Sequence, residues 1–462
     1  MTFVELLVAM ALSMILIYGM VAAFGRVGRE ASDGRARIEM ANQLRNVINR
    51  LNQDLEGATA PVRNWNSPTS GAGYFEAIEG PRNMRTGLGA ATQVQLFDDI
   101  DDVLMFTSRN DANPFRGRIV DYATGNVNYV TSPTAEVIWA ATPITAPLGT
   151  DSDPRDFYIY RRAMLVLPSL NGANGFVHQA VGTLPQLMNV FNQFITGNDL
   201  SVRMSLQPDA SGNYRLRIIA NRMEDLAARE NRFGHRLTVD PNGNALVDNS
   251  IREAFPHSIY VVSGVAPNFT YSYNPAFLRL FANTDAVLMS HVVAFDIKFY
   301  DPSSPGFASA AGSEMLTPAD PGFYTSVDRT TLLGRGNFVD LGYAVTHGTV
   351  DVSHFSSYPH PKSGLRTLAA QVNVFTYDSW SNFYETNGQD EDRDGVTDEG
   401  ADGIDVPTGT PGVGNGIDSF DEHETAPPYG SPPRGIKVTV RLYESDTRQI
   451  RQMSAMSDFI PE

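Results

Sequence analysis

Residues 6–24 read LLVAMALSMILIYGMVAAF, and this stretch decides the first element of the fold. Its nineteen residues carry no charge. At a rise of about 1.5 Å per residue, they form a helix long enough to cross the hydrocarbon core of a membrane. A cleaved signal peptide has a shorter apolar stretch, a basic region before it and a small-residue cleavage site after it, and none of these is present in this sequence. We therefore expect a membrane-type helix.

The apolar pattern changes after residue 25 but continues. Small and apolar residues then recur at spacings of three and four, which is typical of one face of an amphipathic helix: Val27, Ala31, Gly34, Ile38, Ala41, Leu44, Ile48, Leu51 and Leu55. Gly57 and Pro61 supply a stop signal. The sequence predicts one continuous helix from about residue 2 to about residue 57, roughly 80 Å long, whose stripe joins it to the rest of the chain.

Glu5 stands at the entrance to the apolar run. A carboxylate near hydrocarbon costs free energy unless it is paired or neutralised, which makes it a candidate functional residue. The alternative is that Glu5 only reaches the lipid headgroups from the helix end. Arg26 and Arg29 follow the apolar run, and the positive-inside rule then places the bulk of the chain in the cytoplasm. If a basic leader preceded residue 1 and was removed after insertion, its positive charges would reverse this orientation.

The chain after Pro61 has the pattern of short strands separated by Gly, Pro, Asn and Asp clusters. We expect an antiparallel sheet with the amphipathic half-helix across one face, an α+β fold. The predicted strands are 92–97, 103–107, 136–140, 157–167, 200–206, 214–220, 258–263, 291–300, 370–377 and 436–443, and the predicted short helices are 184–195 and 223–232.

Composition excludes several classes of protein. The absence of cysteine excludes disulfides, thiol nucleophiles and cysteine-bound metals. A formal net charge of -17 argues against nucleic acid as a partner. No enzyme motif stands out, so we expect no catalytic activity. The arginines at Arg161, Arg162, Arg215, Arg217 and Arg222 are interpreted as lying on exposed strand faces.

Most of the negative charge lies in one stretch. Residues 385–424 contain thirteen acidic residues and one basic residue, Arg393. Within it, D-x-D-x-D-G-x-x-D matches the first nine positions of a calcium loop, but position twelve is Ala401, where an EF-hand needs Glu. We predict a Ca²⁺ site, with a solvated acidic loop as the alternative. Its candidate ligands are Asp390, Asp392, Asp394, Val396 (carbonyl), Asp398, Glu399, Asp402 and Asp405, and a second site is Asn415, Asp418 and Asp421.

The sequence MTFVE at residues 1–5, followed by the apolar run and the amphipathic half-helix, resembles the mature N-terminus of type IV pilins and type II secretion pseudopilins. The resemblance implies that a prepilin peptidase removes a leader and that Met1 is then N-methylated. It also implies that Glu5 pairs with the Met1 amine of a neighbouring subunit inside a filament. The protein is then held in the bacterial inner membrane, with a periplasmic head, before it enters a periplasmic or surface filament.

Two further stretches, residues 49–58 and 433–453, resemble J-type minor pseudopilins and W-type minor pilins. Such proteins are usually about half this long, which implies large insertions in the head. The expected organisation is a transmembrane or filament-core half-helix (1–25), an amphipathic half-helix packed on the head (26–58), a β-rich head of one or two lobes (59–384), the calcium-binding insertion (385–430) and C-terminal strands (431–462).

The resemblance favours a minor or tip subunit of a pilus or secretion filament whose partners are other pilin subunits. Three alternatives stay open: a major filament subunit, a membrane-anchored calcium-dependent adhesin, and a membrane-tethered hydrolase for which the sequence offers no catalytic group.

Overall fold

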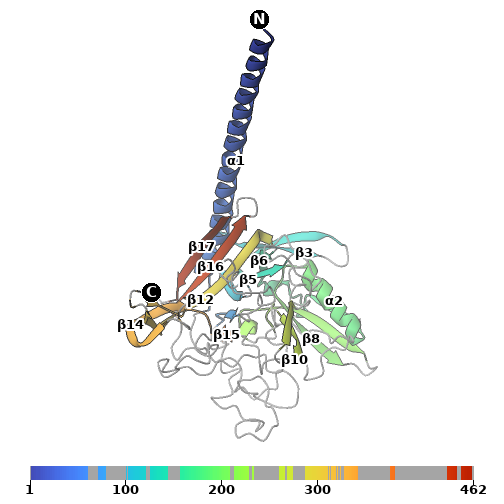
Figure 1. Cartoon of the computed structure of the whole chain (residues 1–462). Helices are drawn as coiled ribbons and strands as arrows, with labels where there is room; N and C mark the ends of the chain where they lie inside the picture. The colour runs from blue at the N-terminus through green and yellow to red at the C-terminus, as the bar shows by residue number, and fades with distance from the viewer. Residues whose placement is uncertain are drawn as a thin grey trace.

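The protein is a long N-terminal helix joined to a β-rich head, an α+β fold (Figure 1). The computed structural model describes residues 2–60, 71–79, 100, 102–120, 125–143, 157–208, 213–227, 231–233, 260–265, 268–273, 287–310, 312, 314–318, 320, 323, 327–341, 375–379, 434–444 and 449–459.

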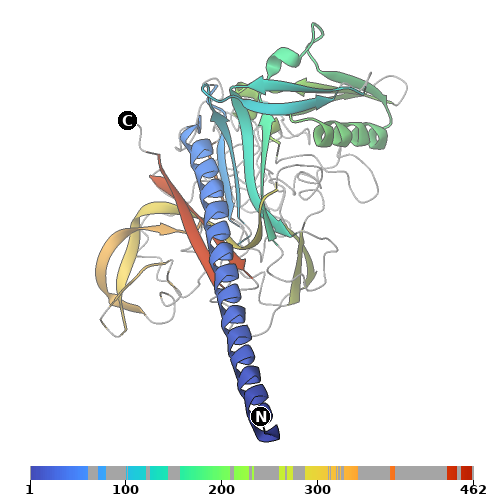
Figure 2. The same ribbon diagram turned by 90° about the horizontal axis from the view of Figure 1, so that it is seen from above.

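Helix α1 (Phe3–Glu56) is continuous over 54 residues, as the sequence predicts. Its N-terminal part projects away from the head, while its C-terminal part lies across the strands of the head (Figures 1 and 2). The packed part starts at Met40, after which buried side chains recur at helical spacing: Met40, Leu44, Val47, Ile48, Leu51 and Leu55. The head thus packs against only the last third of the helix.

The main sheet contains ten strands and its ladders are antiparallel. Its central path runs β15-β1-β2-β5-β6-β12-β16-β17, with β13 and β14 paired to the long strand β12. The strands are β1 (Phe75–Glu79), β2 (Val103–Arg109), β5 (Thr134–Pro143), β6 (Phe157–Leu165), β12 (Val287–Ser309), β13 (Met315–Leu316), β14 (Val327–Val339), β15 (Phe375–Asp378), β16 (Gly435–Glu444) and β17 (Gln449–Asp458).

The core lies between this sheet and α1. Strand β17 runs beside α1 in both views, and the two pack together (Figures 1 and 2). Strand β16 contributes Ile436, Val438 and Val440 to the core. The core also contains a group of aromatic rings, in which Phe75 stacks on Phe106 at 5.6 Å between ring centroids and meets Phe459 edge-on at 5.2 Å. The helix and the last two strands therefore close one core from both ends of the chain.

A smaller lobe is inserted between β6 and β12. It consists of the sheet β7-β9-β8 and helix α2, which packs against β7 and β9. Its elements are η3 (Pro168–Leu170), β7 (His178–Gly182), α2 (Leu184–Gly197), β8 (Val202–Pro208), β9 (Tyr214–Ala220) and η4 (Glu224–Ala227). Two separate hairpins complete the described elements: β3 (Phe115–Val120) with β4 (Val127–Ser132), and β10 (Tyr260–Val265) with β11 (Asn268–Tyr273).

The predicted strands agree with the structure wherever the structure describes them, with β9 matching residue for residue and β12 longer than predicted. The predicted strand 92–97 lies outside the described residues. The predicted helix 184–195 is α2, whereas within 223–232 the described helical residues form only the 3-10 turn η4.

Candidate functional site

The N-terminal half of α1 is an uncovered apolar surface. Between Phe3 and Val27 the large apolar side chains range from 48% exposed at Leu6 to 77% at Phe3. This is the one described helix long and apolar enough to cross a membrane, and none of its most apolar 18-residue window is buried. An unburied stretch of this kind needs lipid or other apolar surfaces around it.

Glu5 lies at the tip of this surface, within the first turn of α1. The backbone N–H of Thr2 donates to Glu5 Oε2 at 2.7 Å, and the Glu5 N–H donates to Thr2 Oγ1 at 3.4 Å. This reciprocal pair is a capping box, which satisfies two N–H groups at the start of the helix. It directs the Glu5 carboxylate back toward the beginning of the chain. Met1 lies outside the described residues.

The other end of α1 is held by a buried carboxylate. Asp54 is 2% exposed and receives hydrogen bonds from Trp139 Nε1 at 3.0 Å and from Arg161 Nε and Nη2 at 2.6 and 2.9 Å. Arg50, one turn earlier, lies 3.6 Å away. A buried carboxylate is tolerated when charged and neutral donors surround it in this way.

The turn after α1 fits closely against β2. The Arg109 N–H donates to the Gly57 carbonyl at 2.7 Å, and Ser108 Oγ donates to the Asp54 carbonyl at 2.9 Å. A Cβ at position 57 would lie 2.5 Å from Ser108 Oγ and 2.6 Å from the Arg109 carbonyl oxygen. Gly57, predicted as a stop signal, is thus required by the close approach of two backbones.

The apolar stripe of α1 is only partly used by the head. Leu44, Ile48, Leu51 and Leu55 are buried, but Val27 is 62% exposed and Ile38 is 64% exposed. The head therefore covers the stripe from Met40 onward and leaves its first three turns uncovered. Val27 and Ile38 therefore stand exposed on a segment whose other residues are mostly polar or charged, and sequence periodicity alone does not show where the head begins.

The head contains a buried polar cluster that the sequence did not reveal. Arg232 and Glu76, both fully buried, form an ion pair at 3.0 Å, and the Arg232 guanidinium lies 4.2 Å from the centre of the Tyr74 ring. The Tyr74 hydroxyl and the Phe233 N–H donate to Glu136 Oε1 at 3.0 and 3.1 Å. Burial raises the pKa of Glu136. The pKa of Tyr74 is also raised, mainly by burial and in second place by the charge of the neighbouring Glu136. These groups bond to one another across segments far apart in the sequence, which favours a structural role.

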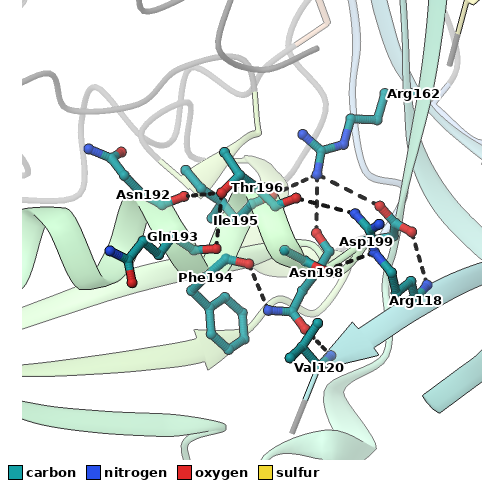
Figure 3. Close-up of polar contacts among 11 residues, drawn as sticks. Arg118, Val120, Arg162, Asn192, Gln193, Phe194, Ile195, Thr196, Asn198 and Asp199 are labelled. Carbon is teal, nitrogen blue, oxygen red and sulfur yellow. Dashed lines mark hydrogen bonds and ion pairs between the residues drawn. The ribbon is translucent and has the colours of Figure 1, made fainter. Parts of the chain in front are cut away.

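Two arginines, one from the main sheet and one from the β3–β4 hairpin, bond to the end of α2 in the small lobe (Figure 3). Arg162 of β6 donates to the carbonyls of Ile195 and Asn198 at 2.6 and 3.2 Å, and Arg118 of β3 donates to those of Gly197 and Thr196 at 3.0 and 3.3 Å. Cations at a helix C-terminus complement its unpaired carbonyls and its dipole.

The interpretation of Arg161 and Arg162 as exposed is therefore wrong, because Arg162 is 3% exposed and the Arg161 side chain 12%. Burial lowers the pKa of Arg162 to about 10. Arg215 and Arg222 are exposed and Arg217 is half-buried, so the interpretation is correct for Arg215. Adjacent residues of a strand point to opposite faces of the sheet. Arg161 therefore bonds to Asp54 of α1 on one face, and Arg162 bonds to the end of α2 on the other.

All candidate calcium ligands, from Asp390 to Asp405 and from Asn415 to Asp421, lie outside the described residues. Within the described part of the chain, no group of three or more His, Cys, Asp or Glu side chains is placed to hold a metal ion. The predicted Ca²⁺ sites stay predictions from the sequence.

No family model, no curated protein and no solved structure matches this chain. Inferences about its function therefore depend on its own residues.

Proposed function

We propose that this protein is a pilin-like subunit, of the minor or tip kind, of a type IV pilus or type II secretion-type filament. In this proposal α1 holds the subunit in the membrane and then packs against the helices of other subunits, while the head is presented outside. The protein acts by assembly and interaction, and a Ca²⁺-loaded 385–430 segment stabilises the head.

One observation carries the proposal: α1 is a single rigid element with two different surroundings. Its first half is apolar and uncovered, and its last turns are bonded to the sheet through Asp54. A bundle of apolar half-helices removes that surface from water as effectively as lipid does, so the same helix serves both locations.

The position of Glu5 supports the same proposal. Its carboxylate lies at the helix tip and points toward the chain start, where the N-terminal amine of an adjacent subunit is the expected partner. An ion pair between these groups offsets the cost of placing a carboxylate among apolar helices. It also fixes the axial position of the subunit, because a shift along the helix leaves both charges unpaired.

The first test is mass spectrometry of the native N-terminal peptide from membrane or sheared-filament fractions. We expect a peptide that begins at Met1 with a methyl group on its α-amine. A retained leader, or cleavage beyond Phe24, contradicts the proposal and leaves the anchored adhesin as the working interpretation.

The second test replaces Glu5 with Gln and compares incorporation into filaments with that of the wild type. The matched control is Glu30→Gln, because Glu30 is exposed on the same helix and pairs with Arg26 four residues before it. We expect the Glu5 variant to fold and reach the membrane but not to enter filaments, and the Glu30 variant to assemble normally. Equal incorporation of both variants contradicts the role of Glu5. The copy number per filament then separates a minor from a major subunit.

A further inference from the structure

The face of the small lobe opposite α2 carries polar side chains that make no hydrogen bond or ion pair with the residues that the structure describes. Strands β7, β9 and β8 bury one face against α2, where His178 stacks on Phe194 at 6.3 Å between ring centroids. The alternate residues point to the other face. They form two rows across the strands, which together we name the arginine face: Gln179, Arg217 and Ser205 in one row, and Val181, Arg215 and Gln207 in the other.

The two arginines of this face are unpaired among the residues that the structure describes. Neither Arg215 nor Arg217 makes a side-chain hydrogen bond or ion pair there, and the same is true of Gln179, Ser205 and Gln207. By contrast, Arg203, the next outward residue of β8, bonds to Asp225 and Asn221. The chain has seventeen excess negative charges, yet no carboxylate among the described residues pairs with these two cations, so an external anion can supply the partner.

We propose that the arginine face binds an acidic polysaccharide whose sugar units carry carboxylates. This inference goes beyond the filament proposal and does not depend on it. Arg215 is exposed and presents a planar fork of donors that matches a carboxylate, whereas Arg217 is half-buried with its Nε buried, so it can offer only its terminal Nη groups. In each row, cross-strand neighbours lie about 5 Å apart, so an amide or hydroxyl stands beside each guanidinium. A uronic acid ring offers a carboxylate and hydroxyls at similar separation.

The remaining side chains of the face also fit a sugar chain. Val181 is 56% exposed and supplies an apolar contact for the C–H side of a ring. The two rows repeat along the strands by roughly 7 Å, which favours a polymer over a single anion. Single-stranded nucleic acid is disfavoured because base binding depends on free aromatic rings. Phe176, an aromatic ring beside the face, is already covered by Arg217, whose guanidinium carbon lies 5.7 Å from the ring centre.

The test measures binding of the full-length protein in detergent to alginate, a polyuronate, with neutral dextran, poly-glutamate and a single-stranded oligodeoxynucleotide as comparisons. The test variant is Arg215→Gln with Arg217→Gln. The control is Arg116→Gln with Arg222→Gln, which removes the same charge from exposed positions outside the face. A third variant, Gln179→Ala with Ser205→Ala, removes the neutral donors beside Arg217 and keeps both arginines. Circular dichroism verifies that all of them fold.

We expect alginate to bind the wild type and the control equally, and the arginine variant roughly tenfold or more weakly, because two charge-assisted contacts are lost. The Gln179 and Ser205 variant should lose affinity for alginate but not for poly-glutamate. The proposal is overturned if alginate does not bind, if the arginine variant binds it as well as the control does, or if poly-glutamate or the oligonucleotide binds the wild type more tightly than alginate.

Discussion

Two hydrogen bonds from the guanidinium of Arg161 bind the carboxylate of Asp54, with Nε to Oδ2 at 2.6 Å and Nη2 to Oδ1 at 2.9 Å. Asp54 belongs to the last turn of α1 and Arg161 to β6, in the middle of the main sheet. This pair is therefore one of the polar connections between the helix and the head, beside the hydrogen bonds that Trp139 and Ser108 donate to Asp54. A pull on the helix, in a membrane or in a filament, is transmitted to the sheet through these bonds and through the apolar residues around them.

The first prediction concerns the replacement of Asp54 with Asn. The variant leaves Arg161 partly buried without its counter-charge, and removing one member of a buried ion pair costs about 3–5 kcal/mol. We expect a loss near the lower end of that range, because Arg161 retains 12% exposure of its side chain. Chemical denaturation of the full-length protein in detergent measures it. Glu56→Gln, an exposed carboxylate at the same helix end, is the control, and equal stability of the two variants contradicts the prediction.

A second prediction concerns Arg162 and the small lobe. Replacing Arg162 with Met keeps an unbranched side chain but leaves the Ile195 and Asn198 carbonyls without this donor, at about 1–3 kcal/mol for an unsatisfied buried group. Relative to the wild type, we expect hydrogen exchange in the variant to become faster in α2, β7 and β9 and to stay unchanged in β16. Arg116→Met is the control, because Arg116 is exposed and lies over the Tyr129 ring at 4.6 Å. Uniform acceleration over the whole head would mean that the lobe does not open separately.

The sequence predicted the elements with strong local patterns. Helix α1 is visible from its apolar run and stripe, and β9 from its alternation of buried Leu216, Ile218 and Ala220 with outward residues. Strand β17 was not predicted as a separate strand, because its residues are mostly polar and only Ala455 is fully buried. It forms because it pairs along ten residues with the strand just before it, β16, and packs on α1, and this second contact joins the two ends of the chain.

The candidate site was predictable only at its N-terminal end. Glu5 is conspicuous as a charge beside an apolar run, but Asp54 looks like any helix carboxylate. Its burial depends on Trp139 and Arg161, 85 and 107 residues away. Strand β1 was missed for the same reason, since its second residue, Glu76, breaks the apolar pattern and is accommodated by Arg232, 156 residues away.

A third prediction follows from the buried carboxyl of Glu136. Burial raises its pKa, so the folded protein holds the proton more tightly than the unfolded chain does. The resulting stabilisation is present below the unfolded pKa of about 4.5 and is lost as pH rises through the folded pKa. Glu136→Gln keeps an acceptor for Tyr74 and cannot ionise. We expect the stability of this variant relative to the wild type to increase with pH, by about 1.4 kcal/mol per unit of pKa difference.

The measurement for Glu136 is the free energy of unfolding of both proteins at a series of pH values from 4 to 8. Comparing the two proteins cancels the titration of every other group. Glu39→Gln, an exposed carboxylate of α1, should show no such pH-dependent difference. A constant gap between Glu136→Gln and the wild type across the series would mean that Glu136 ionises normally in the folded state.

The last prediction concerns calcium and the acidic stretch 385–424. Thirteen acidic residues in forty repel one another unless a cation lies among them, and Asp390, Asp392 and Asp394 have the alternating spacing of calcium ligands. Removing Ca²⁺ with a chelator should therefore make proteolysis within this stretch faster than elsewhere in the head, and adding Ca²⁺ should reverse the effect. Asp390→Asn with Asp392→Asn should be cut rapidly whether or not Ca²⁺ is present. Mg²⁺ at the same concentration is the control, because it requires octahedral geometry and gives up its water reluctantly. Cleavage that is unchanged by the chelator indicates that the stretch holds no calcium, and a solvated acidic loop is then the better interpretation.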